Sequence, residues 1–181
     1  AIAKRLPSAQ QAKPAIVAGP RPERVPLSAA QERLWMLQQL QRDSVPYHYA
    51  HAAILRGDLD VTALQAAFVD VVTRHETLRT LIGVDTANND DAYQLILDPR
   101  SAAEQLQFTV LDVSADADPQ ASARTIAFEK LTANFNLRED LPIRLTVIKV
   151  GEQQHLIAIA MHHIATDEWS DAPLLGDLTR A

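Results

Sequence analysis

Two adjacent histidines near the carboxyl end of the chain, His162 and His163, are followed by Asp167, four residues after the second histidine. The apolar segment 154–161 leads directly into them, and its alternation of side chains is typical of a strand. Because neighbouring residues on a strand point to opposite faces, only one of the two imidazoles can face a given cavity. An imidazole exchanges protons near neutral pH when a partner fixes its orientation and tautomer. Such a segment can place one imidazole at the mouth of an acyl-transfer site.

The same spacing has a second interpretation, in which one histidine is a core residue and Asp167 caps the following helix. A Ser-His-Asp triad is not indicated, because the chain has no Gly-x-Ser-x-Gly elbow. A thiolate nucleophile is excluded, because the chain has no cysteine. We interpret Ser170 as an N-cap and Trp169 as a packing residue.

Two further segments accompany this one: PLSAAQERLW at residues 26–35 and RHETLRT at residues 74–80. Together with MHHIATDEWS at residues 161–170, in this order and at these separations, they resemble the first three core motifs of the condensation domains of nonribosomal peptide synthetases. The resemblance extends from about Val25 to Ala181. One position departs from it: the third motif usually has glycine after the aspartate, whereas this chain has Glu168, which adds bulk and charge beside the histidine.

The resemblance implies an α/β (α+β) fold, a mixed β-sheet covered by helices, as in one chloramphenicol-acetyltransferase-like lobe. It also implies a reaction, in which the amine of a downstream aminoacyl group attacks an upstream acyl or peptidyl thioester. Both substrates would be carried on phosphopantetheine arms of donor and acceptor peptidyl carrier proteins, so no cofactor is expected to bind this chain directly. Residues 25–181 would be the N-terminal, donor-side lobe, with the second lobe absent, and this half alone would be inactive.

The resemblance also assigns roles to individual residues. His163 matches the catalytic histidine, either as a base or as a group that positions the amine, and His162 then turns away from the channel to support the site. Asp167 is expected to pair with Arg74, because a guanidinium can bind a carboxylate through two parallel bonds. Three more residues are candidates for lining the substrate tunnel: Glu168, Trp169 and Tyr47.

Two alternative functions share this pattern. One is a module that keeps the fold without catalysis and recruits a carrier protein or a tailoring enzyme. The other is a related enzyme with a similar histidine signature, either a carnitine or wax-ester type acyltransferase or an epimerization domain. The first and middle motifs favour condensation over both enzymes, while Glu168 favours the non-catalytic module.

Composition narrows the partners further. A formal net charge of −6 with dispersed arginines argues against nucleic acid, which needs a concentrated basic patch. No apolar run approaches the length of a membrane span, and the absence of cysteine suits a cytoplasmic protein. No metal site is predicted, because His48 and His51 lack the helical ligand pattern of zinc enzymes.

Local patterns predict most of the secondary structure. Residues 1–24 contain four prolines and no sustained period, which indicates a flexible linker or docking segment. Ser28 and Gln31 have capping-box spacing, and Asp60 has the position of an N-cap. Helices are expected over 29–41, 61–74 and 119–133 and from about 170, with strands over 47–56, 78–84, 92–97, 107–112, 143–150 and 154–162, the last two forming a hairpin.

Overall fold

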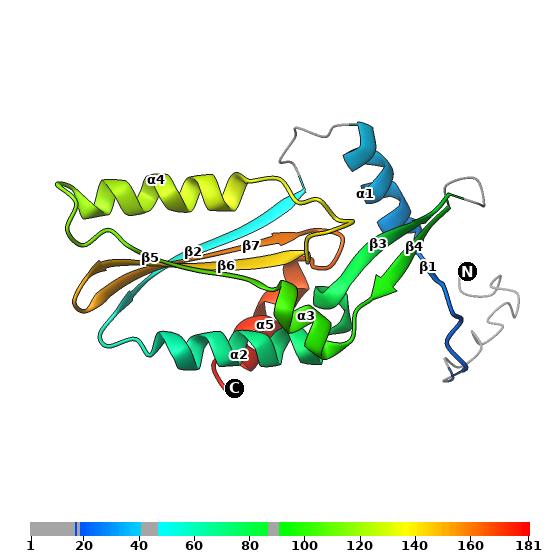
Figure 1. Ribbon diagram of the computed structural model, residues 1–181, viewed down its shortest axis with the longest axis horizontal. Helices are drawn as coiled ribbons and strands as arrows, with labels where there is room; N and C mark the ends of the chain where they lie inside the picture. Colours follow the sequence, from blue (N-terminus) through cyan, green and yellow to red (C-terminus); the bar gives the residue numbers. More distant parts are fainter. Residues whose placement is uncertain (1–16, 18, 41–46, 87–90) are drawn as a thin grey trace, which may run out of the picture.

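The computed structural model describes residues 17, 19–40, 47–86 and 91–181. Its centre is a four-stranded sheet in the order β2-β7-β6-β5 (Figure 1). The strands are β2 (His48–Arg56), β5 (Gln107–Asp112), β6 (Ile143–Gly151) and β7 (Gln154–His162). The β5 and β6 strands are parallel and the other pairs are antiparallel, so the expected mixed sheet is confirmed.

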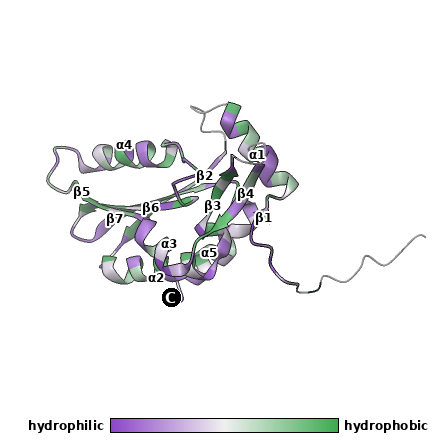
Figure 2. Ribbon diagram, turned by 45° about the vertical axis from the view of Figure 1, so that its right-hand side comes forward, coloured by the Kyte–Doolittle hydropathy of each residue, from purple (hydrophilic) through white to green (hydrophobic). Residues whose placement is uncertain are grey.

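Helices cover both faces of this sheet, as expected. In Figure 1, α4 (Pro119–Thr132) lies over one face, and α2 (Val61–Arg74), α3 (Pro99–Gln105) and α5 (Asp171–Leu178) lie on the other side. A second, smaller sheet in the order β1-β4-β3 comprises β1 (Val25–Pro26), β3 (Thr80–Asp85) and β4 (Asp91–Ile96), and α1 (Ala29–Leu40) lies next to it. Figure 2 shows hydrophobic and hydrophilic residues interleaved along the helices.

The two central strands, β6 and β7, are buried on both faces. On β7, Ile157, Ile159 and Met161 belong to the cluster that α2 covers, whereas Leu156 and Ala158 belong to the cluster under α4. Burial on both faces explains why these strands read as nearly continuous apolar runs in the sequence. The predicted hairpin of β6 and β7 is confirmed.

The predicted helix starts are confirmed in atomic detail. The Gln31 N–H donates to Ser28 Oγ at 3.2 Å while the Ser28 N–H donates to Gln31 Oε1 at 2.9 Å, which is a complete capping box. The Ala63 N–H donates to Asp60 Oδ1 at 2.9 Å at the start of α2. Helix α1 has no fully buried residue: Leu34 is half-buried against a core cluster, and Leu40 is 74% exposed.

Several local elements differ from the sequence prediction. Residues 76–79 form a 3-10 helix, η1 (Glu76–Arg79), so β3 begins at Thr80 and not at residue 78. Helix α3 was not predicted, although Asp98 followed by Pro99 is an N-cap signal. The short strand β1 was also missed. Residue 41, the segment 43–46, most of the turn 86–91 and most of the linker 1–24 lie outside the described residues. Among the described residues, no helix is long and apolar enough to cross a membrane.

His162, the last residue of β7, lies in an aromatic cluster at the end of the sheet, and only 2% of it is exposed. The ring centroids of His48 and Phe135 lie 5.9 and 6.0 Å from that of His162. The guanidinium of Arg144 lies 3.7 Å from the centroid of the Phe135 ring. The pKa of His162 is lowered to about 4, mainly by burial in this cluster. The positive charges that His48 and His163 can carry also lower this pKa and are the smaller causes.

We therefore expect the His162 imidazole to stay neutral in the folded protein down to about pH 4. In the unfolded chain its pKa is 6.5, so between the two values the unfolded state binds more protons. Stability is then retained above 6.5 and falls as the pH decreases towards 4. At 1.36 kcal/mol per pKa unit, the loss is on the order of 3 kcal/mol. An NMR titration of the ring measures the pKa of His162 in the folded protein. Urea unfolding at both ends of this pH window measures the free energy of unfolding.

The control is His162→Gln, which removes the titrating ring. Its free energy of unfolding should depend less on pH over the same window, because only the remaining titrating groups contribute. A His162 ring that titrates near 6.5 in the folded protein would contradict the prediction.

Candidate functional site

The end of the β6–β7 hairpin places the two adjacent histidines on opposite faces of the sheet. In the β2–β7 register, His48 pairs with His162 and Tyr49 pairs with Met161. The pairing continues one residue further, because the His163 N–H donates to the Tyr47 carbonyl at 2.9 Å. His162 therefore lies with His48 on one face, and His163 lies with Tyr49 on the other.

His163 is half-buried, and one of its ring nitrogens faces a backbone carbonyl. Its Nδ1 lies 3.3 Å from the Thr166 carbonyl oxygen. A carbonyl oxygen only accepts hydrogen bonds, so this contact requires the proton on Nδ1. In the neutral ring, Nε2 then carries the lone pair and can accept a proton or a hydrogen bond. Tyr47 contributes to the site through its backbone carbonyl.

His162 supports the same loop from the buried side. Its ring Nδ1 accepts a hydrogen bond from the Ile164 backbone N–H at 3.1 Å. The backbone N–H of His162 donates to the Pro142 carbonyl at 2.9 Å. The low pKa of His162 keeps the ring neutral, so Nδ1 remains an acceptor. The ring thereby holds the backbone immediately after His163.

Asp167 holds the other end of this loop as a helix cap. Its Oδ1 accepts hydrogen bonds from the Trp169 N–H at 3.1 Å and from Ser170 Oγ at 2.9 Å, and the Asp167 N–H donates to Ser170 Oγ at 3.1 Å. These bonds form a capping box at the 3-10 helix η2 (Glu168–Ser170). The interpretation of Asp167 as a cap is therefore the one that the structure adopts. Ser170 precedes α5 as expected, but its side chain makes no cap hydrogen bond there, because it is bound to Asp167.

The expected ion pair between Arg74 and Asp167 is wrong. Arg74 is the last residue of α2, 71% of its side chain is exposed, and its Nε lies 3.4 Å from Asp177 Oδ2 on α5. Asp177 also binds His75 Nε2 at 2.8 Å, and this hydrogen bond is the main cause of the lowered pKa of Asp177. The physical reason is proximity: α2 packs against α5, whereas the loop turns the Asp167 carboxylate back onto its own backbone.

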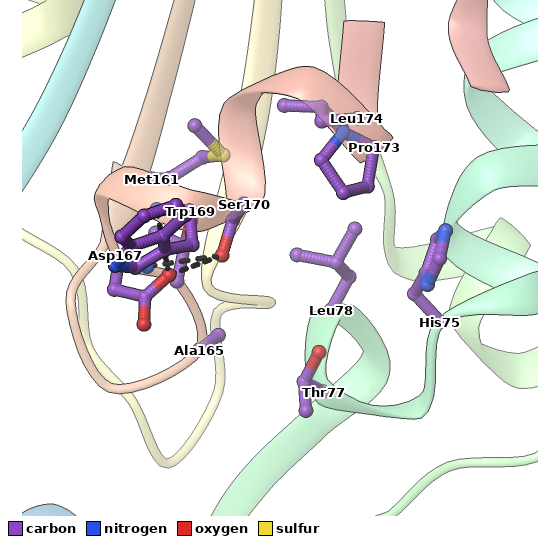
Figure 3. A pocket seen from close by; sticks show the side chains of 11 residues that line it. His75, Thr77, Leu78, Met161, Ala165, Asp167, Trp169, Ser170, Pro173 and Leu174 are labelled. Carbon is purple, nitrogen blue, oxygen red and sulfur yellow. Dashed lines mark hydrogen bonds between the residues drawn. The ribbon is translucent and has the colours of Figure 1, made fainter. Parts of the chain in front are cut away.

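A cavity of about 220 Å³ lies between η1 and the loop after His163 (Figure 3). It is lined by His75, Thr77, Leu78, Met161, Ala165, Thr166, Asp167, Trp169, Ser170, Pro173 and Leu174. Of the three residues expected to line a tunnel, only Trp169 lines this cavity. Leu78 and Leu174 also line the cavity but were not among the predicted residues, although Leu78 belongs to the RHETLRT segment.

The two residues after Asp167 both face solvent. Trp169 is 86% exposed, so its interpretation as a packing residue is wrong. Glu168, which stands where related motifs have glycine, is the first residue of η2 and is also exposed. Its carboxylate therefore adds charge at the surface of the loop and not bulk in the core.

The geometry predicts that Arg74 and Asp167 are energetically independent. Asp167→Ala should cost about 1 kcal/mol through the lost cap, and Arg74→Ala should cost about 0–1 kcal/mol because the Arg74 side chain is largely exposed to solvent, which weakens its ion pair. Urea unfolding of the double variant should give the sum of the two costs within about 0.5 kcal/mol. A coupling of several kcal/mol would show that the two side chains pair after all.

The chain is similar in sequence to large peptide synthetases. The chain is 40% identical over 166 residues to an isonitrile lipopeptide synthase of Mycobacterium tuberculosis. The aligned region covers 92% of the chain and 6% of that protein. It is 36% identical over 180 residues to a dimodular nonribosomal peptide synthase of Bacillus subtilis. Here the aligned region covers 99% of the chain and 7% of that protein. The chain thus spans a small part of the curated relatives that it matches.

Solved structures agree with this result. The starter condensation domain of rhizomide synthetase superposes with a TM-score of 0.76 at 27% identity, over 87% of the chain and 36% of that domain. A chain of the complex of the X-domain and OxyB from teicoplanin biosynthesis superposes with a TM-score of 0.78 at 34% identity, over 91% of this chain and 34% of that chain. The condensation-domain family model matches residues 22–181, which include all three motif segments and the His163 loop. The chain therefore belongs to the condensation-domain family of nonribosomal peptide synthetases.

Proposed function

We propose that residues 25–181 work as the N-terminal lobe of a condensation domain that forms an amide bond between two carrier-bound substrates. The observation that carries the proposal is the geometry of His163, which directly follows β7. Its Nδ1 contacts the Thr166 carbonyl oxygen, so in the neutral ring Nε2 carries the lone pair. The family match and the described fold support it. Because the chain spans about a third of the solved neighbours, we propose that a second lobe completes the site.

The reaction follows from the chemistry of the substrates. The acceptor amine attacks the carbonyl carbon of the donor thioester, a C–N bond forms, and the C–S bond breaks. The amine must lose a proton, and His163 Nε2 accepts it; the proton then neutralises the departing thiolate of the donor arm. The thioester is already activated, so the chain needs no serine or cysteine nucleophile.

The partners that this reaction requires are an upstream donor and a downstream acceptor carrier protein. Their phosphopantetheine arms supply the thiols, so the chain itself holds no cofactor in this proposal. The first lobe contributes the histidine, and a facing lobe would hold the two reacting groups close together, which supplies much of the rate of a two-substrate reaction.

A non-catalytic recruitment role is the second candidate. It is favoured by the likeness to the X-domain, which the solved structure shows in complex with OxyB. The two functions differ in their dependence on His163, because recruitment uses a surface and catalysis uses the ring.

We expect His163→Ala, in a condensation domain made of this chain and its second lobe, to lower the rate of amide formation by about 10²–10⁴-fold, the usual contribution of a general base. Intact mass of the acceptor carrier protein measures the product. The melting temperature should change little, because the His163 ring is half-buried.

His162→Ala is the matched control on the neighbouring residue. It removes a fully buried ring that accepts a bond from the Ile164 N–H, so its main effect should be a lower melting temperature. Full activity of the His163→Ala variant, with binding of a partner retained, would replace the catalytic proposal by recruitment.

A further inference from the structure

Three side chains beside His163 form a set of contacts that the motifs do not include. Asp171, the first residue of α5, accepts a hydrogen bond from Tyr49 Oη at 2.7 Å through Oδ2. Its other oxygen, Oδ1, lies 3.0 Å from His51 Nε2. An ionised carboxylate only accepts hydrogen bonds, so both partners donate to it. Asp171 thereby ties the edge strand β2 to the start of α5.

Tyr49 connects this set to the histidine. Its ring centroid lies 5.5 Å from that of His163 at an interplanar angle of 61°, and 4.8 Å from that of His51. Tyr49 pairs with Met161 across the strands, which makes His163 its diagonal neighbour on the same face. Aromatic side chains are long enough to reach a diagonal neighbour. The ring of Tyr49 therefore packs against the ring of His163.

The hydrogen bond of the His163 ring is long, so the contact with Tyr49 adds to the restraint on the ring. The distance of 3.3 Å from Nδ1 to the Thr166 carbonyl oxygen exceeds the usual range for a hydrogen bond between N–H and O. A single long bond restrains the ring poorly against rotation. The bond from Tyr49 to Asp171 is short and charge-assisted, and it also raises the pKa of Tyr49, so the phenol remains a donor.

We propose that Asp171, acting through Tyr49, fixes the orientation of the His163 ring and hence its Nδ1–H tautomer. Tyr49 and Asp171 are positioning residues: neither needs to touch substrate. The consequence for catalysis rests on the proposed function, because a base contributes only while Nε2 carries the lone pair and faces the amine. The restraint itself is a property of this chain and is measured without any reaction.

The experiment is ¹⁵N NMR of histidine-labelled 181-residue protein at a pH where the rings are neutral. In the unmodified protein, the two ring nitrogens of His163 should be widely separated in chemical shift, with the proton on Nδ1. Tyr49→Phe keeps the ring and removes the anchoring hydroxyl, so the two shifts should move towards each other as both tautomers become populated. Asp171→Ala should have the same effect.

Two variants separate positioning from general stability. Asp171→Asn keeps an oxygen that can accept from Tyr49, so it should restore the separation of the two shifts. Asp177→Ala breaks the other carboxylate–histidine contact of α5, to His75, and should leave the His163 signals unchanged. If Tyr49→Phe and Asp171→Ala leave the His163 signals as in the unmodified protein, the proposal is overturned. Should Asp171→Ala fail to fold, Tyr49→Phe decides, because it removes only one oxygen.

A kinetic measurement links the restraint to the reaction. In the condensation domain with both lobes, Tyr49→Phe should lower kcat by roughly tenfold to a hundredfold with little change in KM, as expected for a misplaced catalytic group. An unchanged rate together with shifted NMR signals would overturn the catalytic part and retain the restraint. If instead His163→Ala leaves the rate unchanged, the proposed function fails, and the NMR result still decides whether Asp171 positions the ring.

Discussion

The antiparallel pairing of β6 and β7, buried on both faces, is the constraint on which the rest of the structure depends. One face of the pair packs under α4 and the other against α2, so a shift of one residue would place each side chain on the wrong face. The register is therefore strongly specified. It continues through the end of β7, where it decides that His162 enters the core and that His163 does not.

The loop after the hairpin is held from both sides by different kinds of interaction. On the buried side, neutral His162 binds the Ile164 N–H, and at the far end Asp167 caps η2 through Ser170. Between these two points, the Thr166 carbonyl faces His163. The backbone of the loop is thus fixed locally, so the orientation of the histidine ring is the main freedom that remains.

In our proposal, the orientation of the His163 ring is restricted by the contacts of α5. Its first residue, Asp171, binds Tyr49 and His51 of β2, and one to two turns later Asp177 binds Arg74 and His75 at the end of α2. The helix therefore joins β2, the strand that pairs with β7, to the middle motif segment. A general base works only within hydrogen-bond reach of the proton that it accepts, so such fixed geometry matters for the function proposed here.

Local sequence determined the elements whose signals lie within a few residues of one another. The capping box at Ser28 and Gln31, the N-cap at Asp60, the apolar runs of β6 and β7, and the opposite faces of the two histidines could all be predicted, because backbone periodicity and caps act over short distances. The RHETLRT and MHHIATDEWS segments also identified the family. Helix α3 was missed although its cap was visible at Asp98, since a seven-residue helix has little periodicity to detect.

Only the tertiary structure decided which charged groups meet. The packing of α2 on α5 brings Arg74 to Asp177, 103 residues away in the chain, and not to Asp167. The contact between Tyr49 and Asp171 likewise joins residues 122 positions apart. Such partners cannot be predicted from spacing, because a hydrogen bond is formed over about 3 Å and its two ends come together only when the sheet and the helix have packed.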